Sequence, residues 1–525
     1  MDLSILFILA ILPMLMIFIG LVLFRQSGTL MGVVGWVLTV IIAVFFFQTS
    51  ASVALAASWE GVLSSFGISL MVLFSILQVT MMDVTGAISS ITAYIKTIAA
   101  ERYEQIMMLN VGFGTFLVSI GATPVTMLPP IMLALGFSPL AAVALPCLGY
   151  DPLTSFSLLA VPITLPASVF GLDVRSLGIT VAWFLPVIST GIALAMLWVA
   201  DGWTGVKKGF FTALVAGLTL GLCAILFVHI LPAAAIGLVG VFSGIVTVAV
   251  LFLMRKIRGR PLDVAGPAAI ETAKEERKGK MPLWKASLPW LVLVIFCIVI
   301  SIPVIKSGLP SILGNLQKIP VLADQVVNLN LLSQAYFWVL ISTLITAPVL
   351  IRSKDEIGKI TKLWLKRAWS PTLAAMVFFA IAYVMDWSGQ SVINGALTLA
   401  PTASNMNVVI GLVLALIFGF AFPLFSPMLG LFGSFVSGSE TSSNVMFYGI
   451  LKKSTDVLNL NFLQVYAAHL VAGGIASGIA VAKIINAAAV VDKIGIEGEV
   501  VRKVAPVAIV LTIITGVMLV LMLVF

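Results

Sequence analysis

The chain has 525 residues, of which 61% are hydrophobic and only 10% are charged, and its mean hydropathy is +1.18. A soluble domain carries about 25% charged residues, so this composition excludes a soluble globular protein and predicts an all-α polytopic membrane protein. The formal net charge of +8 comes from a few basic loops. It therefore reports orientation in a bilayer, and no nucleic-acid partner is expected.

Apolar runs of about 20 residues, the length that crosses a bilayer as a helix, recur along the chain. The first run is followed, not preceded, by its basic residue Arg25 and lacks a small-residue cleavage site. We therefore expect a retained first helix with the N-terminus outside. The stretch 408–424 is either a further crossing or one arm of a polar segment. About twelve crossings are predicted, near residues 4–24, 29–49, 60–82, 139–164, 178–200, 210–230, 233–254, 287–307, 331–351, 371–385, 461–482 and 504–525.

The longest polar segment, residues 255–286, is predicted to be a charged cytoplasmic linker. Between Arg255 and Lys285 it carries nine Lys or Arg against four Asp or Glu, and cytoplasmic loops are rich in basic residues. The linker divides the chain into an N-terminal transmembrane half, residues 1–254, and a C-terminal half, residues 287–525. The basic stretch at 352–367 is likewise expected to be a cytoplasmic loop.

Two segments, near 104–135 and 427–451, are polar or broken by glycine and do not resemble simple spans. Within them, "FGTFLVSIGATPVTM" (113–127) aligns without gaps on "FGSFVSGSETSSNVM" (432–446). A second similarity relates "DVTG" from Asp83 to "DWSG" from Asp386, and the loop charges orient the spans before these two motifs oppositely. We therefore predict inverted repeats, each with a re-entrant hairpin, an architecture typical of secondary transporters.

The residue types in the two hairpins suit a binding site for a small anion. Irregular backbone at membrane depth is tolerated where it lines a cavity or binds a ligand, and the N-termini of half-helices favour a carboxylate. Glycine permits the tight turns, and hydroxyl groups satisfy freed backbone groups. The alternative is a pair of surface turns capped by Ser and Thr. The predicted substrate-binding residues are Ser119, Gly121, Thr123, Thr126, Ser437, Ser439, Thr441, Ser442, Ser443 and Asn444.

Ionisable side chains within the apolar runs are candidates for proton coupling, because a buried charge in hydrocarbon costs at least about 3 kcal/mol and usually has a function. Glu440 and Asp151 are predicted proton carriers, since each lies among polar neighbours in a central element. His469 either shuttles protons or hydrogen-bonds across helices. Asp83 and Asp386 stand at span ends, where capping of the following helix explains them equally well.

Other chemistries find little support in the sequence. The three cysteines lie in apolar runs without paired spacing, and no Walker loop or zinc-binding motif is present, so no cofactor, metal site or ATP-driven pumping is expected. Lys483 either offsets an anionic substrate or snorkels to the cytoplasmic surface, and we expect the second.

Several stretches resemble the L-lactate permease family. "ADGWTGVKK" (200–208) resembles a "DGW-G-K" turn of that family, and "FSPMLGLFGSFVSGSETSSNVMF" is similar to its "GS-(D/E)-TSSN" signature. "GFSPLAA", "LLAVPI", "LWKASLPWL" and "DWSGQ" also fit, so the resemblance covers about residues 100–495. It implies proton-coupled uptake of lactate, glycolate and related 2-hydroxymonocarboxylates across the cytoplasmic membrane, without a cofactor, by an elevator-type carrier whose moving domain bears two hairpins.

The chain departs from the family pattern in its first hairpin. That hairpin carries a Glu and a glycine-rich run in the family, whereas here the segment is two residues shorter and Val118 aligns with the Glu. "SGIAVAKI" (477–484) replaces a "GK-ISPQ" stretch. Asp151 and His469 stand where the family has uncharged polar residues. The coupling acid is therefore expected to have moved to Asp151 or Glu440.

The sequence thus predicts a secondary active transporter that carries a lactate-like 2-hydroxymonocarboxylate in symport with protons. The protein is expected to be multi-pass in the cell membrane. The sequence does not determine its oligomeric state. A sodium-coupled carboxylate transporter or a cation/proton antiporter on the same scaffold is the alternative, because hydroxyl and carbonyl groups also coordinate Na⁺. A membrane enzyme acting on lipid would need a base near a nucleophile, and only His469 is available. A passive channel would not need paired inverted elements. No enzymatic activity is expected.

Overall fold

Helices dominate the computed structural model of the chain. Within the described residues, nine helices are long and apolar enough to cross a membrane, so the chain is a multi-pass, essentially all-α membrane protein. Two of the predicted site residues, Thr123 and Asp151, are not among the residues that the structure describes, and the side chain of Thr126 is not described either. The structure describes residues 2–24, 26–95, 101–121, 124–150, 152–259, 281–300, 302–322, 325–393, 395–400, 403–489, 491, 493 and 495–524.

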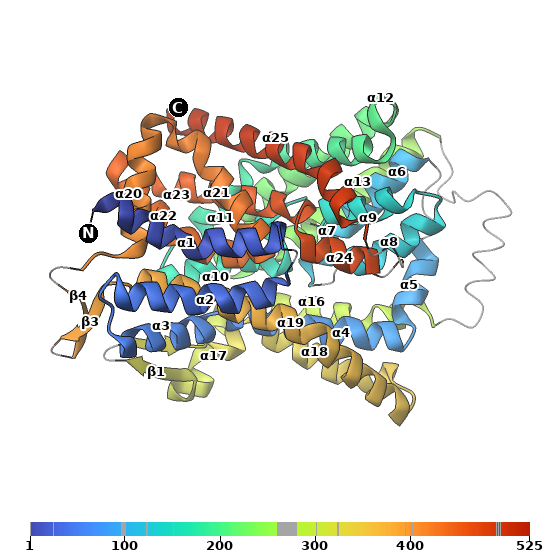
Figure 1. Cartoon of the computed structure of the whole chain (residues 1–525). Helices are drawn as coiled ribbons and strands as arrows, with labels where there is room; N and C mark the ends of the chain where they lie inside the picture. Colours follow the sequence, from blue (N-terminus) through green and yellow to red (C-terminus); the bar gives the residue numbers. More distant parts are fainter. Residues whose placement is uncertain are drawn as a thin grey trace.

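One layer of the molecule is built around the packing of the N-terminal helices on α19, which lie together in Figure 1. Gly61 of α3 meets the backbone of α19 at Phe379 and Ala380, and the indole of Trp364 donates to the carbonyl of Leu73, so α19 runs antiparallel to α3 and α4. The helices of this layer are α1 (Leu3–Val22), α2 (Gly28–Phe45), α3 (Ala51–Ser64), α4 (Phe66–Val84), α16 (Leu288–Ile300), α18 (Ala335–Leu350) and α19 (Lys354–Asp386).

The second layer contains two helical hairpins. In the first hairpin, α6 (Arg102–Ile106), the π-helical η1 (Met107–Phe113) and α7 (Gly114–Ser119) form the incoming arm, and α8 (Pro124–Ala134) forms the outgoing arm. In the second hairpin, α21 (Phe422–Ser437) enters and α22 (Glu440–Leu458) leaves. Both segments therefore contain two consecutive helical arms, residues 122–123 between the arms of the first lie outside the described residues, and the re-entrant placement predicted for 104–135 and 427–451 stays a prediction.

Each hairpin is followed by an interrupted helix. The first consists of α9 (Pro139–Leu148) and α10 (Val161–Phe170), joined through the short turns η2 (Thr154–Phe156) and η3 (Leu158–Ala160); the second consists of α23 (Phe462–Ile475) and α24 (Val481–Ala489), joined through η8 (Ala476–Gly478). The single span predicted at 139–164 is wrong, whereas the one predicted at 461–482 falls within Phe462–Ala488, which is long and apolar enough to cross a membrane and contains the interruption at η8. Hydropathy cannot detect these interruptions, because the unwound residues are themselves mostly small or apolar.

The remaining helices of this layer cover the hairpins. α12 (Leu185–Ile230) doubles back on itself at Gly202 (φ +63°), and the backbones of Gly217 and Gly221 lie against Thr190 and Pro186. The spans predicted at 178–200 and 210–230 are therefore the two arms of this element, the first continuing from α11. The elements are α11 (Val174–Ala182), α12, η4 (Ala233–Leu238), α13 (Val239–Ile257), α20 (Met406–Phe418), η7 (Gly419–Ala421) and α25 (Glu497–Val524).

The structure corrects one further prediction and describes one stretch whose role the sequence left open. The segment 352–367 is helical and forms the first half of α19, whose N-cap Ser353 accepts a hydrogen bond from the Glu356 amide. The stretch 408–424 is not one element, because α20 ends before Gly419 (φ +49°) and α21 begins at Phe422.

Short elements lie near the ends of the long helices. Two antiparallel strand pairs, β1 (Lys318–Leu322) with β2 (Gln325–Asn328) and β3 (Gln390–Ile393) with β4 (Ala396–Leu399), lie at the end of the molecule where the N-terminus is marked (Figure 1). The other short elements are α5 (Ala87–Ile95), α15 (Leu283–Ala286), α17 (Pro303–Leu313), η5 (Gly314–Gln317) and η6 (Leu331–Ser333).

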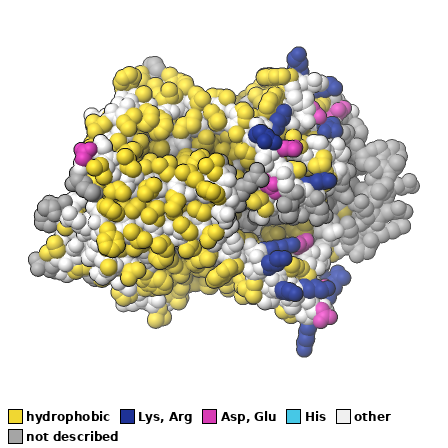
Figure 2. Space-filling view, in the orientation of Figure 1, with side chains coloured by type: hydrophobic (Ala, Val, Ile, Leu, Met, Phe, Trp, Pro, Cys, Tyr) yellow, Lys and Arg dark blue, Asp and Glu magenta, His cyan; other side chains and the backbone are white. Residues whose placement is uncertain are grey.

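Charge is distributed unevenly along the long axis of the molecule. Lys and Arg side chains gather at the end opposite the two chain termini, and a wide hydrophobic surface separates the two ends (Figures 1 and 2). Cytoplasmic surfaces of membrane proteins are rich in Lys and Arg. This distribution agrees with the predicted orientation, in which the basic end is cytoplasmic and the end with the termini is external, and the orientation stays a prediction.

Candidate functional site

The tip of the second hairpin is a tight turn stabilised by its own serines. Gly438 adopts a left-handed conformation (φ +70°), which a residue with a Cβ rarely adopts. The hydroxyl of Ser437 lies 2.7 Å from the Gly433 carbonyl and 2.8 Å from the Ser439 carbonyl. Ser439 caps α22 by accepting from the Ser442 amide at 3.3 Å. These two predicted substrate ligands therefore shape the turn.

Glu440 connects the second hairpin to the first interrupted helix. Its side chain is 6% exposed, and its carboxylate accepts a hydrogen bond of 2.5 Å from the hydroxyl of Ser155, which lies in η2. One turn further along α22, the side-chain amide of Asn444 donates to the Pro162 carbonyl at 3.0 Å. The start of α22 is therefore fixed to the interruption between α9 and α10.

The backbone of this first interruption is strained. Thr154, Leu158, Leu159 and Ala160 all have positive φ angles, between 49° and 57°. The left-handed conformation costs a residue with a side chain about 1–2 kcal/mol. Such residues persist where their surroundings impose the conformation, and they cluster at functional sites. The packing around the interruption therefore maintains its strained backbone.

Buried polar atoms without partners lie beside Gly473 of α23, and the carbon atoms of Thr154 pack against the next residue, Gly474. A Cβ placed on Gly473 would lie 2.8 Å from the Ser434 hydroxyl and 3.6 Å from Asn444 Oδ1, and Thr154 lies directly against Gly474. The hydroxyls of Ser434 and Thr154 and the Oδ1 of Asn444 have no hydrogen-bond partner among the described residues. Because buried polar groups are nearly always satisfied, this cluster is a candidate site for a ligand, an ion or water.

His469 lies on the other side of the same hairpin. It is fully buried in α23, its Nε2 is 3.3 Å from the Ser443 hydroxyl, and within the described structure its Nδ1 has no partner. Tyr466, one turn earlier, donates its hydroxyl to the Asn444 carbonyl at 2.9 Å. The structure therefore brings His469 to the second hairpin, behind its tip.

The tip of the first hairpin carries much less polar chemistry. Ser119 is fully buried against Gly240 of α13, and its hydroxyl has no partner within the described part of the chain. Gly121 (φ +87°) lies against Ser75 of α4. Val118, which aligns with the acid of the related family, is an apolar core residue at 1% exposure.

The predicted site residues therefore fall into two groups. Glu440, Ser443, Asn444 and His469 gather around α22 and α23, with Thr441 and Ser442 buried in the same turn. The residues of the first tip lie on the far side of the first interruption. The carbonyl of Phe156, next to Ser155, meets the same Gly240 as Ser119, so the interruption lies between the two tips.

Sequence reasoning missed the residues that complete this arrangement. No motif marks the residues Thr154, Ser155, Ser434 and Gly473, although the run "GYDPLTSF" combined glycine, proline and hydroxyls in an apolar span.

Lys483 was expected to snorkel outward. Instead its ammonium donates to Ser477 at 2.7 Å and lies 3.9 Å from the centre of the Tyr150 ring, between the two interruptions.

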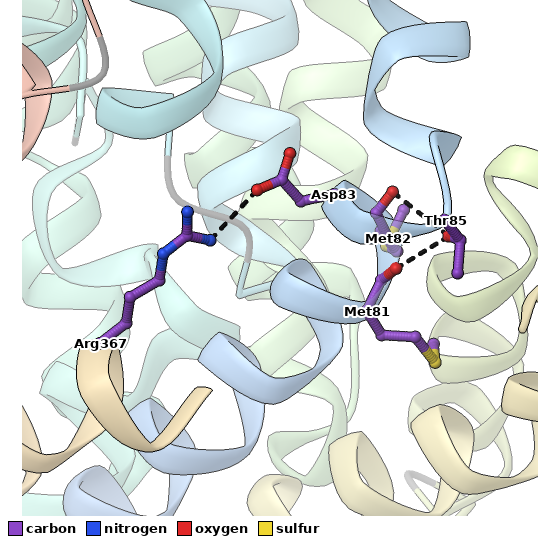
Figure 3. A network of polar contacts seen from close by, with 5 residues as sticks. All are labelled: Met81, Met82, Asp83, Thr85 and Arg367. Carbon is purple, nitrogen blue, oxygen red and sulfur yellow. Dashed lines mark hydrogen bonds and ion pairs between the residues drawn. The ribbon is translucent and has the colours of Figure 1, made fainter. Parts of the chain in front are cut away.

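A buried ion pair anchors the base of the first hairpin. Arg255 of α13 and Glu104 of α6 are 3% and 4% exposed, and their nearest atoms are 2.5 Å apart. Sequence reasoning assigned Arg255 to the linker. A comparable contact near the cytoplasmic end, between Asp83 of α4 and Arg367 of α19 at 3.1 Å, is half exposed (Figure 3).

Comparison with known proteins identifies the family. The family model described as L-lactate permease matches residues 6–525. The glycolate permease GlcA of Escherichia coli (strain K12) is 25% identical over 94% of this chain and 91% of its own length. L-lactate permeases of Streptococcus iniae and Bacillus subtilis (strain 168) are 25% and 26% identical, over 86% and 85% of this chain and 92% and 83% of their own lengths. The chain belongs to the L-lactate permease family and is a transport protein rather than an enzyme.

Proposed function

We propose that this member of the L-lactate permease family carries a small 2-hydroxymonocarboxylate, such as lactate or glycolate, across the cell membrane in symport with protons. The curated relatives are named for L-lactate and glycolate, two anions of this chemical class. In the proposal, the two hairpins are re-entrant, and their layer moves as an elevator against the layer built around α19.

The observation that carries the proposal is the convergence of buried polar atoms on Glu440. The hydroxyls of Ser434 and Thr154 can donate to a carboxylate or to a 2-hydroxyl group, and the N-terminus of α22 adds partial positive charge. Lys483 lies between the interruptions and supplies a cationic group in the same region. These groups match the carboxylate and the hydroxyl of the proposed substrate.

Glu440 explains why a proton would accompany the anion. An ionised carboxylate repels a substrate carboxylate bound close to it, and protonation removes this repulsion. Proton binding and anion binding then favour each other, and linkage makes this coupling reciprocal. Asp151 stays a second candidate for the same role, and His469 is positioned to relay a proton past Ser443.

The same cluster also favours sodium coupling as a second candidate function. The unpartnered atoms beside Gly473 are both oxygens, the hydroxyl of Ser434 and the amide carbonyl of Asn444. Hard cations are bound by oxygen ligands of this kind. In this version, Na⁺ would occupy the cluster and compensate the charge of Glu440.

Uptake by purified protein in proteoliposomes tests the two candidates. We expect labelled lactate or glycolate to accumulate when an inward proton gradient is imposed without sodium, and a protonophore to abolish the accumulation. Accumulation that follows only an inward Na⁺ gradient would replace the first candidate by the second. A thermal-shift series with lactate, glycolate, longer carboxylates and Na⁺ ranks the ligands independently, because a ligand that binds the folded state stabilises it.

A further inference from the structure

The side-chain amide of Asn444 has two ends with different surroundings. The residue is fully buried in α22, one turn after Glu440. Its Nδ2 donates to the Pro162 carbonyl at 3.0 Å. A carbonyl oxygen can only accept a hydrogen bond, so this contact fixes which end of the amide is the nitrogen. The other end is therefore Oδ1, and it has no partner among the described residues.

This amide oxygen lies beside Gly473 of α23. A Cβ placed on Gly473 would lie 2.8 Å from Ser434 Oγ and 3.6 Å from Asn444 Oδ1. The same point is 3.1 Å from Glu440 Cγ. Polar side chains from both arms of the second hairpin therefore surround one point on α23, and the absence of a side chain at Gly473 lets them approach it.

The two unpartnered atoms at this point have different hydrogen-bonding capacities. Asn444 Oδ1 can only accept, whereas the Ser434 hydroxyl can donate as well as accept. A ligand hydroxyl can donate to Oδ1 and accept from Ser434 at the same time. A carboxylate oxygen has no proton to donate, and it would lie against an amide carbonyl and near the Glu440 carboxyl. The hydroxyl of a 2-hydroxy acid therefore fits this point better than its carboxylate does.

We propose that Asn444 determines specificity for 2-hydroxy acids by accepting a hydrogen bond from the 2-hydroxyl group of the substrate, while Ser434 donates to the same hydroxyl. This role of Asn444 rests on the proposed transport function. It orients the substrate with its hydroxyl at Gly473. The carboxylate is left for other donors of the region, such as the Thr154 hydroxyl, which has no partner within the described chain.

The orientation of Asn444 predicts which analogues the site rejects. A ligand without the 2-hydroxyl leaves the amide oxygen buried and unpaired, which weakens binding about 5- to 150-fold. Sites built around a substrate hydroxyl reject analogues that lack it for this reason. A 2-oxo group is rejected as well, because it accepts and cannot donate. Lactate should therefore bind more tightly than propionate, which lacks the hydroxyl, and than pyruvate, in which a carbonyl replaces it.

The test compares dissociation constants of lactate, propionate and pyruvate, measured by titration calorimetry on the purified full-length protein. Asn444→Leu nearly keeps the size of the side chain and removes the acceptor. We expect it to lower the preference for lactate over both analogues from about 5- to 150-fold towards one. An equal loss of affinity for all three ligands, with the ratios kept, would show that Asn444 only supports the fold and would overturn the proposal.

Two further variants isolate the role of Asn444. Asn407→Leu is the matched control, because Asn407 is also a buried amide with an unpartnered Oδ1 in the described structure but lies in α20, where it donates to Asp386. It should keep the wild-type ratios. Ser434→Ala should keep the preference for lactate over pyruvate, since the acceptor at Asn444 remains. Thermal unfolding checks that each variant is folded, and Asn444→Ala gives the same comparison if Asn444→Leu is not.

The remaining outcomes separate this role from the transport function itself. Wild-type protein that binds lactate, propionate and pyruvate equally would overturn the role of Asn444 and leave the transport of carboxylates standing. Unchanged ratios in Asn444→Leu, together with loss of a sodium dependence of uptake in proteoliposomes, would identify Na⁺ as the occupant and overturn the proposal. Wild-type protein that binds and transports none of the three anions and no glycolate would refute the proposed function, and the role of Asn444 with it.

Discussion

The two hairpins share a shape and differ in where they hold their charge. In the second hairpin, Glu440 lies at the tip, on Ser155, and the charged residues at the base, Lys452 and Asp456, are half exposed. In the first hairpin the described tip residues include Ser119 and the apolar Val118, Thr123 lies outside the described residues, and the acid, Glu104, is buried at the base with Arg255. The two hairpins therefore differ chemically in the described part of the chain: one carries a buried acid at its tip, and the other carries a buried ion pair at its base.

The largest expected effect comes from breaking the anchor of the first hairpin. Arg255→Met leaves the buried carboxylate of Glu104 without its cation, and breaking a buried pair in this way costs about 3–5 kcal/mol of unfolding free energy. Unfolding in detergent, followed by circular dichroism, measures the loss. Lys452→Met is the matched control, because it removes the half-exposed pair with Asp456 and should cost less than about 1 kcal/mol. The double variant Glu104→Gln/Arg255→Met should regain part of the stability. Equal losses in the two single variants would contradict the anchoring role.

The next effect tests the chemistry of the second hairpin. Glu440→Gln keeps the size of the side chain and removes the charge that accepts from Ser155, an interaction of about 1.5–3 kcal/mol. We expect proton-driven uptake to fall about 10- to 150-fold, with the fold retained. Asp456→Asn, near the solvent-exposed end of the same helix, should transport normally. Full activity in Glu440→Gln would exclude Glu440 as the coupling acid, and Asp151 would then be the next acid to test.

A third prediction compares the packing of the two hairpins. The backbone carbonyl of His469 occupies the position that a Cβ on Gly430 would take, so Gly430→Ala must displace α21 from α23 and should cost about 1–3 kcal/mol. In the first hairpin, Gly112 meets mainly the side-chain methyl of Val248, which can rotate, so Gly112→Ala should cost less. Gly358→Ala in α19 has open space and should be neutral or slightly stabilising. Thermal unfolding ranks the three variants, and a Gly430→Ala protein as stable as Gly358→Ala would show that the hairpin is loosely packed.

The smallest effect is expected where charge is exposed. Asp83→Asn removes a half-exposed ion pair with Arg367, and such pairs contribute less than about 1 kcal/mol. Unfolding measurements at low and high salt should show a small loss that salt reduces further. A loss comparable to that of Arg255→Met would mean that this exposed contact stabilises the fold as much as the buried pair does.

The sequence by itself determined the membrane class and the family, and the inverted repeat stays a prediction. Composition and the length of apolar runs report transfer into hydrocarbon directly, and the similarity of 113–127 to 432–446 located both hairpins. Glycines and serines in "SGSETSSN" predicted the turn at Gly438, because local backbone chemistry decides such turns. Glu440 was identified for the same reason, as an acid among hydroxyls in an apolar protein.

Only the tertiary structure decided which residues meet. The interruptions at 149–160 and 476–480 lie inside longer apolar runs and are imposed by packing, so hydropathy predicted a continuous helix across each. Ser155 hydrogen-bonds to Glu440, which is 285 positions later in the chain. Thr154 and Ser434 could be recognised as candidate site residues only because the fold packs them beside Gly474 and Gly473. Asp83 and Asp386 have similar local sequences and different partners, Arg367 for one and Asn407 for the other. Long-range contacts of this kind leave no periodic pattern, because each depends on how separate helices pack.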